Sequence, residues 1–467
     1  MVFSSLIFLF FFLPLLLILY FAVPGKYKNA VLIMFSLLFY SYGEPVYVLV
    51  MLFSTIVDYT VGRLIARGRS RNKNTKIYLL VSVVVNLSLL GIFKYGDFAI
   101  TNINSLIGGT IPLMGISLPI GISFYTFQTM SYSIDVYRGR VEAQRSFFDL
   151  LLYTSLFPQL VAGPIVRYST IAEQINNRTV TLTSFSDGFC KFVCGLSKKI
   201  LIANSLASVA DYVFGQAVTD TAVATAWLGI VAYTFQIYFD FSGYSDMAIG
   251  LGKMFGFDFE INFNYPYISS SISEFWRRWH MSLGSWFRDY LYFPLGGSRV
   301  GKARLVFNLF VVWGLTGLWH GASWNFVLWG LLFFVCIAVE KLSGIDTKKY
   351  NPLGNIITML IVMLGWVFFR ADTITYAWDY IKNLFGQAGT KLYDYDSIYY
   401  FWQKIDVYIL ALICSLPVLP FISKKLKNKT VVGIYNMVTQ IACVLLFVVC
   451  VIFLVNDSYN PFIYFRF

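Results

Sequence analysis

The chain has 467 residues, of which 58% are hydrophobic and 13% are charged, and its formal net charge is +12. A mean hydropathy of +0.66 excludes an ordinary soluble globular protein. The basic balance does not require a nucleic-acid partner, because Lys and Arg accumulate in the cytoplasmic loops of membrane proteins. Continuous apolar stretches, each long enough to cross a hydrocarbon core of about 30 Å, predict an all-α polytopic membrane protein in contact with lipid.

These apolar stretches predict roughly eleven or twelve transmembrane helices within a single domain that covers residues 1–467. The first stretch lacks the basic residues that precede a cleaved signal sequence, so we expect it to remain as a helix. The state of residues 184–213 stays open. The predicted spans are 6–23, 29–42, 46–61, 77–95, 118–136, 222–250, 305–320, 324–343, 353–370, 405–422 and 431–455.

Clusters of basic residues between these spans predict the orientation of the chain. Six basic residues lie between Arg63 and Lys76. Placing this loop in the cytoplasm, together with the basic groups in 138–145, 299–304 and 424–429, gives a consistent alternation of spans. We therefore predict a multi-pass protein of the cell membrane with its N-terminus and its C-terminus outside.

Two segments are too irregular to be simple spans. Pro158 and Pro164 interrupt the apolar segment 156–168, and proline removes a helix hydrogen bond and clashes with the preceding turn. The segment 258–298 carries several charged side chains among aromatic ones. Polar, non-helical backbone persists at membrane depth only inside protein or beside a wet cavity. Both segments are therefore predicted to be re-entrant, and the second is expected to line the cavity.

Short motifs exclude several enzyme classes. The sequence contains no G-x-S-x-G, H-E-x-x-H or P-loop motif, which argues against hydrolases of that type, zinc peptidases and P-loop enzymes. The six cysteines lie almost entirely in apolar stretches, where a thiol behaves as a small hydrophobic side chain. No spacing of Cys and His predicts a zinc site, so we expect no bound metal.

The chain has only two histidines, and both lie in unusual surroundings. His280 belongs to the aromatic and charged stretch WRRWHMSLGSWFRDYLYFPLGG (276–297). His320 lies at the end of an uncharged stretch, in WGLTGLWHGASWNFVLWG (313–330). An ionisable group within a membrane is costly and is a functional candidate by default, with an interhelical hydrogen bond as the alternative.

The surroundings of His320 predict a dry site. Gly317 and Gly321 are four residues apart, a spacing that lets another helix backbone approach closely beside the imidazole. Burial favours the neutral form of an imidazole, whose ordinary pKa is about 6.5, and a neutral imidazole accepts a proton from a hydroxyl or thiol. This chemistry suits acyl transfer. The segment around His280 carries more charges, so we expect it to be wetter and His280 to support the reaction without being its base.

Two stretches together resemble the membrane-bound O-acyltransferase family, and within it the branch of the alginate O-acetyltransferase membrane subunit. They are SEFWRRWHMSLGSWFRDYLYFPLGGSR (273–299) and GLWHGASWNFVLWG (317–330). The supporting stretches are LPIGISFYTFQTMSYSIDVYRG (118–139), FPQLVAGPIVRY (157–168), YFDFSGYSDMAIGLGKMFGFDFEINFNYPY (238–267) and NPFIYFRF (460–467). The resemblance extends over essentially the whole chain. A related branch that D-alanylates teichoic acids shares the W-H-x-S-L-x-x-W-F-R-D core, whereas the L-Y-F-P-L-G-G continuation favours the alginate-type branch.

The resemblance implies about eleven spanning helices around a thin central region, with a funnel from outside and a tunnel from the cytoplasm. It implies that His320 is the catalytic base and that His280 lines the same passage. It further implies O-acetylation of an extracytoplasmic polysaccharide, with acetyl-CoA as the cytoplasmic acyl donor, no permanently bound cofactor and an extracytoplasmic SGNH-type partner. D-alanyl or other short-acyl transfer to a cell-envelope polymer is the alternative.

Five side chains near the two histidines are candidates for the tunnel wall. Trp276 and Trp319 are the aromatic ones. Arg277 and Arg278 have guanidinium groups that match the phosphates of a coenzyme A donor, or alternatively they cap a helix end or meet lipid headgroups. Asp289 either orients a histidine or forms a structural ion pair with the arginine before it, and the ion pair is favoured.

Three polar side chains within predicted spans are weaker candidates. Asp240 is costly in an apolar span, so we expect it to hydrogen-bond inside the bundle, with a place in the tunnel wall as the alternative. Tyr125 and Gln128 are interpreted as helix-packing residues, again with the tunnel wall as the alternative.

Two other functions remain to be weighed against acyl transfer. A transporter of a lipid-linked sugar would also need polar groups near the membrane midplane, but such transporters commonly contain internal repeats and paired broken helices. The sequence shows no clear internal repeat. A structural scaffold of a secretion complex would need neither histidine. Acyl transfer is therefore the leading hypothesis.

Overall fold

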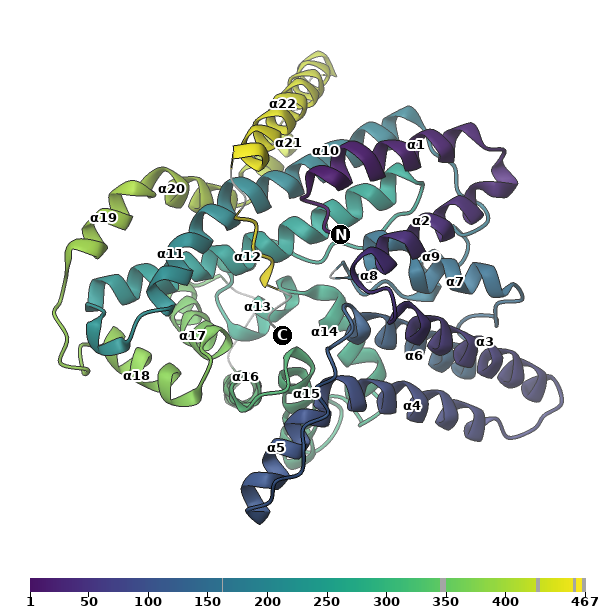
Figure 1. The fold of residues 1–467 in the computed structure, drawn as a ribbon, viewed down its shortest axis with the longest axis horizontal. Coiled ribbons are helices and arrows are strands. Elements are labelled where there is room, and N and C mark those ends of the chain that lie inside the picture. The colour runs from purple at the N-terminus through teal and green to yellow at the C-terminus, as the bar shows by residue number, and fades with distance from the viewer. Residues whose placement is uncertain (162, 345–349, 426–428, 457–458, 464–467) are drawn as a thin grey trace. The chain divides into compact units, whose positions relative to one another are not determined.

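The computed structural model describes residues 1–161, 163–344, 350–425, 429–456 and 459–463, and every regular element among them is a helix (Figure 1). The predicted all-α architecture is confirmed. The chain divides into two compact units. Unit 1 comprises Met1–Phe192 and Met247–Glu260, and unit 2 comprises Val193–Asp246 and Ile261–Phe467.

Unit 1 contains the first half of the helices. They are α1 (Leu13–Ala22), α2 (Lys28–Gly43), α3 (Val48–Ser70), α4 (Lys76–Leu90), α5 (Gly96–Ile107), α6 (Ile122–Arg138), α7 (Phe147–Ser155), α8 (Phe157–Leu160), α9 (Tyr168–Ile171) and the first part of α10 (Leu182–Ser197). Its interior is partly polar: Asp58 on α3 is fully buried and accepts hydrogen bonds from Ser82, from Ser133 at 2.6 Å and from Asn86 at 2.8 Å. Because a buried carboxylate needs such partners, these bonds join α3, α4 and α6.

Unit 2 contains both histidines. Its helices are α11 (Asn204–Phe214), most of α12 (Val223–Met254), α13 (Ile272–Arg278), α14 (Met281–Phe287), α15 (Lys302–His320), α16 (Trp324–Ser343), α17 (Pro352–Arg370), α18 (Ile374–Leu384), α19 (Tyr395–Gln403), α20 (Ile405–Cys414), α21 (Val418–Lys425) and α22 (Lys429–Asn456). Trp329 and Trp366 are completely buried at the centre of its apolar core, among aromatic side chains from α13, α15, α16 and α17.

The region left open by the sequence, 184–213, is a single long helix. Residues Leu182–Phe214 form one continuous helical segment of 33 residues, in which a wider turn at Lys198–Ala203 joins α10 to α11. A similar turn at Gly91–Tyr95 joins α4 to α5, so the predicted span 77–95 extends to Ile107. Such inserted turns widen an α-helix locally and redirect its side chains.

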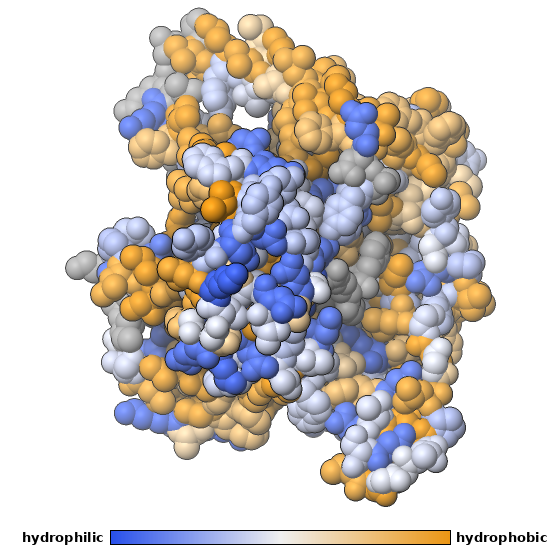
Figure 2. Space-filling model, turned by 60° about the vertical axis from the view of Figure 1, so that its left-hand side comes forward, coloured by the Kyte–Doolittle hydropathy of each residue, from blue (hydrophilic) through white to orange (hydrophobic). Residues whose placement is uncertain are grey.

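Six helical segments are long and apolar enough to cross a membrane among the residues described. They are Val48–Ser70, Lys76–Ile107, Leu182–Phe214, Trp324–Ser343, Pro352–Arg370 and Val431–Asn456. Figure 2 shows large hydrophobic areas on the surface, as expected where lipid replaces water, and hydrophilic residues near the middle of the same view. The predicted spans at α12 and α15 are present as helices but are not among these six, since buried polar residues such as Gln236 and Asn308 lie within them.

The two segments predicted to be irregular are both broken. Residues 156–168 contain only the short helix α8 before an irregular stretch that leads to α9, and Ala162 lies outside the described residues. Residues 258–298 contain the short helices α13 and α14. The predicted span 405–422 is wrong as a single helix: it is divided into α20 and α21 before Val418, because Pro417 cannot continue α20. Residues 426–428 of the last basic group are not described.

Candidate active site

His320 is the last residue of α15, and the packing of α15 on α16 fixes its place. The two helices form an antiparallel hairpin in which glycine replaces side chains at the contact. A Cβ on Gly317 would overlap the carbonyl oxygen of Phe326, and a Cβ on Gly330 would overlap that of Trp313. The close backbone approach predicted at Gly317 is therefore confirmed, and it brings the end of α15 against the start of α16.

Aromatic rings surround the His320 imidazole. The ring centroids of Trp319, Trp329 and Phe369 lie 5.0, 4.8 and 5.2 Å from that of His320, each in an edge-to-face arrangement. The His320 residue is 7% exposed. Because these rings come from α15, α16 and α17, three helices of unit 2 enclose the imidazole.

His280 lies in the turn between α13 and α14, and it is as buried as His320. Its backbone has φ +43° and ψ +54°, a left-handed conformation that is uncommon for a residue other than glycine. The residue is 3% exposed, and burial lowers its pKa to about 3. The expectation of a wetter site is wrong, because His280 is buried. Four of the charged side chains of this segment form ion pairs with one another, Arg278 with Glu274 and Arg288 with Asp289.

The two histidines share one neighbour. The Trp319 ring lies 5.0 Å from the His320 ring and 5.9 Å from the His280 ring, centroid to centroid. Both imidazoles therefore flank the same indole, although they are forty residues apart in the chain. In the part of the chain that the structure describes, Nδ1 of His280 is buried and makes no hydrogen bond to another residue.

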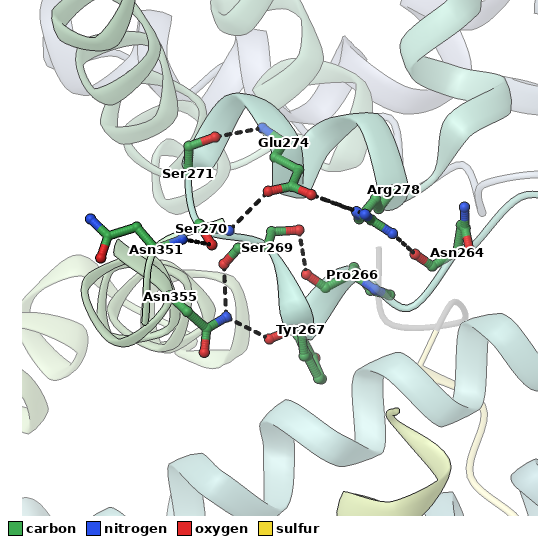
Figure 3. Close-up of polar contacts among 10 residues, drawn as sticks. All are labelled: Asn264, Pro266, Tyr267, Ser269, Ser270, Ser271, Glu274, Arg278, Asn351 and Asn355. Carbon is green, nitrogen blue, oxygen red and sulfur yellow. Dashed lines mark hydrogen bonds and ion pairs between the residues drawn. The ribbon is translucent and has the colours of Figure 1, made fainter. Parts of the chain in front are cut away.

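A network of polar contacts holds the loop that leads into α13 (Figure 3). The Glu274 carboxylate accepts a hydrogen bond from the Ser270 amide at 3.0 Å and forms an ion pair of 3.0 Å with Arg278. Arg278 also donates to the carbonyl oxygen of Asn264 at 3.1 Å. From α17, Asn355 donates to the carbonyl oxygens of Tyr267 and Ser269 at 3.0 and 2.8 Å.

The first turn of α13 receives a further carboxylate from α16. Glu340 accepts hydrogen bonds from the amides of Ile272 at 2.6 Å and Ser273 at 2.8 Å. These two amides belong to the first turn, whose donors have no partner within the helix, and a negative charge there also favours the helix dipole. The short helix that precedes His280 is thereby fixed to the hairpin that carries His320.

The candidate side chains near the histidines have different surroundings. Trp276 packs against Trp329, at 5.4 Å between centroids, so it supports the ring that contacts His320. Arg278 is engaged in the loop network, whereas Arg277 is exposed. Asp289 forms an ion pair with Arg288 at 2.8 Å.

Asp240 belongs to a buried ion pair that the sequence did not reveal. It lies 2.6 Å from the ammonium group of Lys199, and both side chains are almost completely buried. Asp240 also accepts a hydrogen bond from the Ile463 amide at 2.8 Å, and Lys199 donates to the carbonyl oxygen of Pro461. The pair therefore anchors the C-terminal residues 459–463 to α12, and residues 464–467 lie outside the described residues. The signal in the sequence that could have indicated this pair is the presence of two adjacent lysines, Lys198 and Lys199, within an apolar helix.

Tyr125 and Gln128 belong to unit 1. Both lie on α6 and are completely buried there. Within the described residues, no group of three or more His, Cys, Asp or Glu side chains is arranged to hold a metal ion.

Comparison with known proteins assigns the sequence to a family. The model of MBOAT, the membrane-bound O-acyltransferase family, matches residues 110–377, which include both histidines and more than half of the chain. The chain belongs to the membrane-bound O-acyltransferase family. It is therefore a membrane-bound enzyme that transfers acyl groups to oxygen, and the transporter and scaffold hypotheses are set aside.

Relatives within this family differ in their named acceptors. The protein named probable alginate O-acetylase AlgI of Azotobacter vinelandii is 40% identical over the whole length of both chains. The peptidoglycan O-acetyltransferase of Helicobacter pylori is 36% identical over 84% of this chain and 81% of that protein. The teichoic acid D-alanyltransferase of Bacillus subtilis is 29% identical over 53% of this chain and 66% of that protein.

Proposed function

We propose that this enzyme transfers acetyl groups from a cytoplasmic donor to an exported polysaccharide. Membership of the acyltransferase family establishes the reaction class. The choice of acetyl is supported by the relatives named as O-acetylating enzymes, which match this chain at higher identity and over more of its length than the D-alanyltransferase does. We propose acetyl-CoA as the donor and a polysaccharide hydroxyl, or a hydroxyl of a partner protein, as the acceptor.

The observation that carries the mechanism is the pair of buried imidazoles on either side of Trp319. A neutral imidazole can remove a proton from a hydroxyl group. His320 takes the proton of the attacking hydroxyl as the new C–O bond forms on the acyl carbonyl. The C–S bond to the donor then breaks, and the leaving thiolate receives the proton from His320. The dry surroundings strengthen each of these electrostatic contacts.

His280 has a supporting part in this mechanism. Its Nδ1 is buried and makes no hydrogen bond to another described residue, and we propose that it binds a substrate atom. A general base contributes about 10²–10⁴-fold to a rate, and positioning of the reacting groups contributes further. We assign the first effect to His320 and the second to His280. Trp319, Trp276, Arg277, Arg278, Asp289 and Asp240, all in unit 2, are proposed as further tunnel residues.

The orientation follows from the basic loops. We propose that the protein lies in the inner membrane with the loop 63–76 in the cytoplasm and both termini outside. The donor then enters from the cytoplasm, and the acceptor lies on the outer side. We further propose an extracytoplasmic partner of the SGNH-hydrolase type that receives or passes on the acetyl group. No permanently bound cofactor is required, since the donor is a substrate.

The direct test of this function is the acyl content of exported polymers. Cells that lack the gene should lose O-acetyl esters from one exported polysaccharide, and the intact gene should restore them. The esters are released with mild alkali and identified as acetate or D-alanine by mass spectrometry. Loss of D-alanine esters with unchanged acetate would contradict acetyl transfer and favour the D-alanyl alternative. Unchanged levels of both esters would reject the proposed function altogether.

A further inference from the structure

The side chain of Asn262 joins the turn that carries His280 to α12 by a hydrogen bond. This residue lies in the irregular stretch after α12 and is 3% exposed. Its amide group donates to the Ser245 hydroxyl on α12 at 3.0 Å. Ser245 is itself buried, so the bond forms inside unit 2. Asn262 is therefore fixed on one side by a helix of the bundle.

On its other side, Asn262 binds the two residues that follow His280. Its backbone oxygen accepts a hydrogen bond from the Met281 amide at 2.9 Å. Its side-chain oxygen accepts from the amide of Ser282 at 3.1 Å and from the hydroxyl of Ser282 at 2.9 Å. These amides belong to the first turn of α14, and such donors need partners from outside the helix.

The backbone that precedes His280 is held in a parallel way by Asn264. The amide of Asn264 donates to the carbonyl oxygen of Arg278 at 2.9 Å, and Arg278 returns a side-chain bond to the Asn264 oxygen (Figure 3). The backbone is thus fixed before and after His280. This double attachment matters because the left-handed conformation of His280 is unfavourable for a residue other than glycine and persists only where the surroundings determine it.

We infer that Asn262 is a positioning residue for His280, which holds the turn so that the imidazole stays against Trp319 with Nδ1 available to a substrate. The carboxamide suits this task because one planar group supplies a donor toward α12 and an acceptor toward α14. Alanine supplies neither, and aspartate keeps the acceptor while the Ser245 hydroxyl becomes the donor. The inference rests on the proposed function, in which His280 assists acyl transfer.

Kinetics of a double-mutant cycle test this role. Asn262→Ala should lower acetyl transfer about tenfold or more, because a displacement of about 1 Å can cost up to 10²-fold in rate. In a His280→Gln background the same change should lower transfer less than about twofold, since residues that act through one another are not additive. Asn262→Asp should restore part of the lost activity. Equal factors in both backgrounds would overturn the inference.

A spectroscopic readout covers the case in which His280→Gln has no measurable activity. The protein has only two histidines, so a preparation labelled with ¹³C-histidine and carrying a tag without histidine gives two imidazole signals. The signal that disappears in His280→Gln belongs to His280. Asn262→Ala should move this signal and leave that of His320 in place. An unmoved His280 signal in folded Asn262→Ala protein would overturn the inference.

Two further variants serve as controls. Asn383 on α18 is a fully buried asparagine of unit 2 that donates to the Thr221 carbonyl oxygen at 2.8 Å and has no described contact with either histidine. Asn383→Ala should leave both signals in place. If Asn262→Ala does not fold, Ser245→Ala, which removes only the bond to α12, should still shift the His280 signal, and an unmoved signal would overturn the inference. If the intact protein transfers no acetyl group but the signal still moves, the proposed function fails while the positioning of the ring stands.

Discussion

The two histidines are placed by different physical means, although both lie in buried surroundings of unit 2 beside Trp319. His320 ends a regular helix, and glycine-mediated contact between α15 and α16 determines where that helix ends. His280 lies in a left-handed turn between two seven-residue helices, and hydrogen bonds from Asn262, Asn264 and Arg278 hold that turn. Close packing of helix backbones therefore positions the His320 imidazole, whereas hydrogen bonds from neighbouring residues position the His280 imidazole.

This difference explains which part of the site could be predicted from the sequence. The spacing of Gly317 and Gly321 and the uncharged stretch before His320 predicted a close helix contact and a dry imidazole, and the structure has both. The charges around His280 predicted a broken segment correctly but a wet one wrongly. Charged residues within a segment do not reveal whether they face its histidine or one another, since that depends on partners such as Glu340 that lie far away in the chain.

Replacing the glycine at the α15–α16 contact should have the largest effect. Gly317→Ala places a methyl group against the Phe326 backbone, and such overpacking costs about 1–3 kcal/mol or more where backbone cannot move. We expect a marked loss of folded protein and of acetyl transfer. Gly314→Ala on the same helix is the matched control, because a Cβ there has no neighbour within 4 Å. Measuring thermal stability in detergent should separate the two variants, and equal stabilities would contradict the packing account.

The burial of His280 predicts that the stability of the folded protein depends on pH, with an effect of intermediate size. Because its pKa is lowered in the folded protein, the folded state binds fewer protons than the unfolded chain below about pH 6.5. Stability should therefore fall as the pH falls, by about 2 kcal/mol from this group between pH 7 and pH 5. Thermal unfolding across this range should show a weaker pH dependence in His280→Gln than in the intact protein. The same slope in both proteins would mean that His280 is hydrated.

The same comparison shows how much of the overall fold the sequence determines. Apolar helices that face lipid, such as α16, α17 and α22, match their predicted spans within two residues. Helices with buried polar groups are harder to delimit, since the Lys199–Asp240 pair within α10–α11 and α12 lowers their hydropathy without exposing them to water. Which buried polar groups pair inside the bundle depends on the three-dimensional structure, so a hydropathy profile of the sequence does not reveal it.

Cysteine labelling tests the predicted orientation of the chain, which determines the side from which the donor enters. The substitutions that it needs should have little effect on activity. The loop 63–76 is predicted to be cytoplasmic, and Lys73 is exposed within it, whereas Asn72 has a φ of +51° and is better left unchanged. Lys73→Cys should resist an impermeant thiol reagent in intact cells and react after permeabilisation. Thr110→Cys, in a loop predicted to lie outside, should react in intact cells, with the native protein as the baseline. Ready labelling of Lys73→Cys would reverse the predicted topology.

The central claim is that His320 is the base of an acyl transfer, and the activity of His320→Ala tests it most directly. Removing the imidazole should lower O-acetylation of the exported polymer by about 10²-fold or more, while protein level and monodispersity in detergent stay close to those of the intact protein. The measurement compares ester content in cells that produce equal amounts of each variant, with His280→Gln, expected to retain measurable activity, alongside. Acetylation at the native level by well-produced His320→Ala protein would contradict the mechanism and leave His320 as a packing residue between helices.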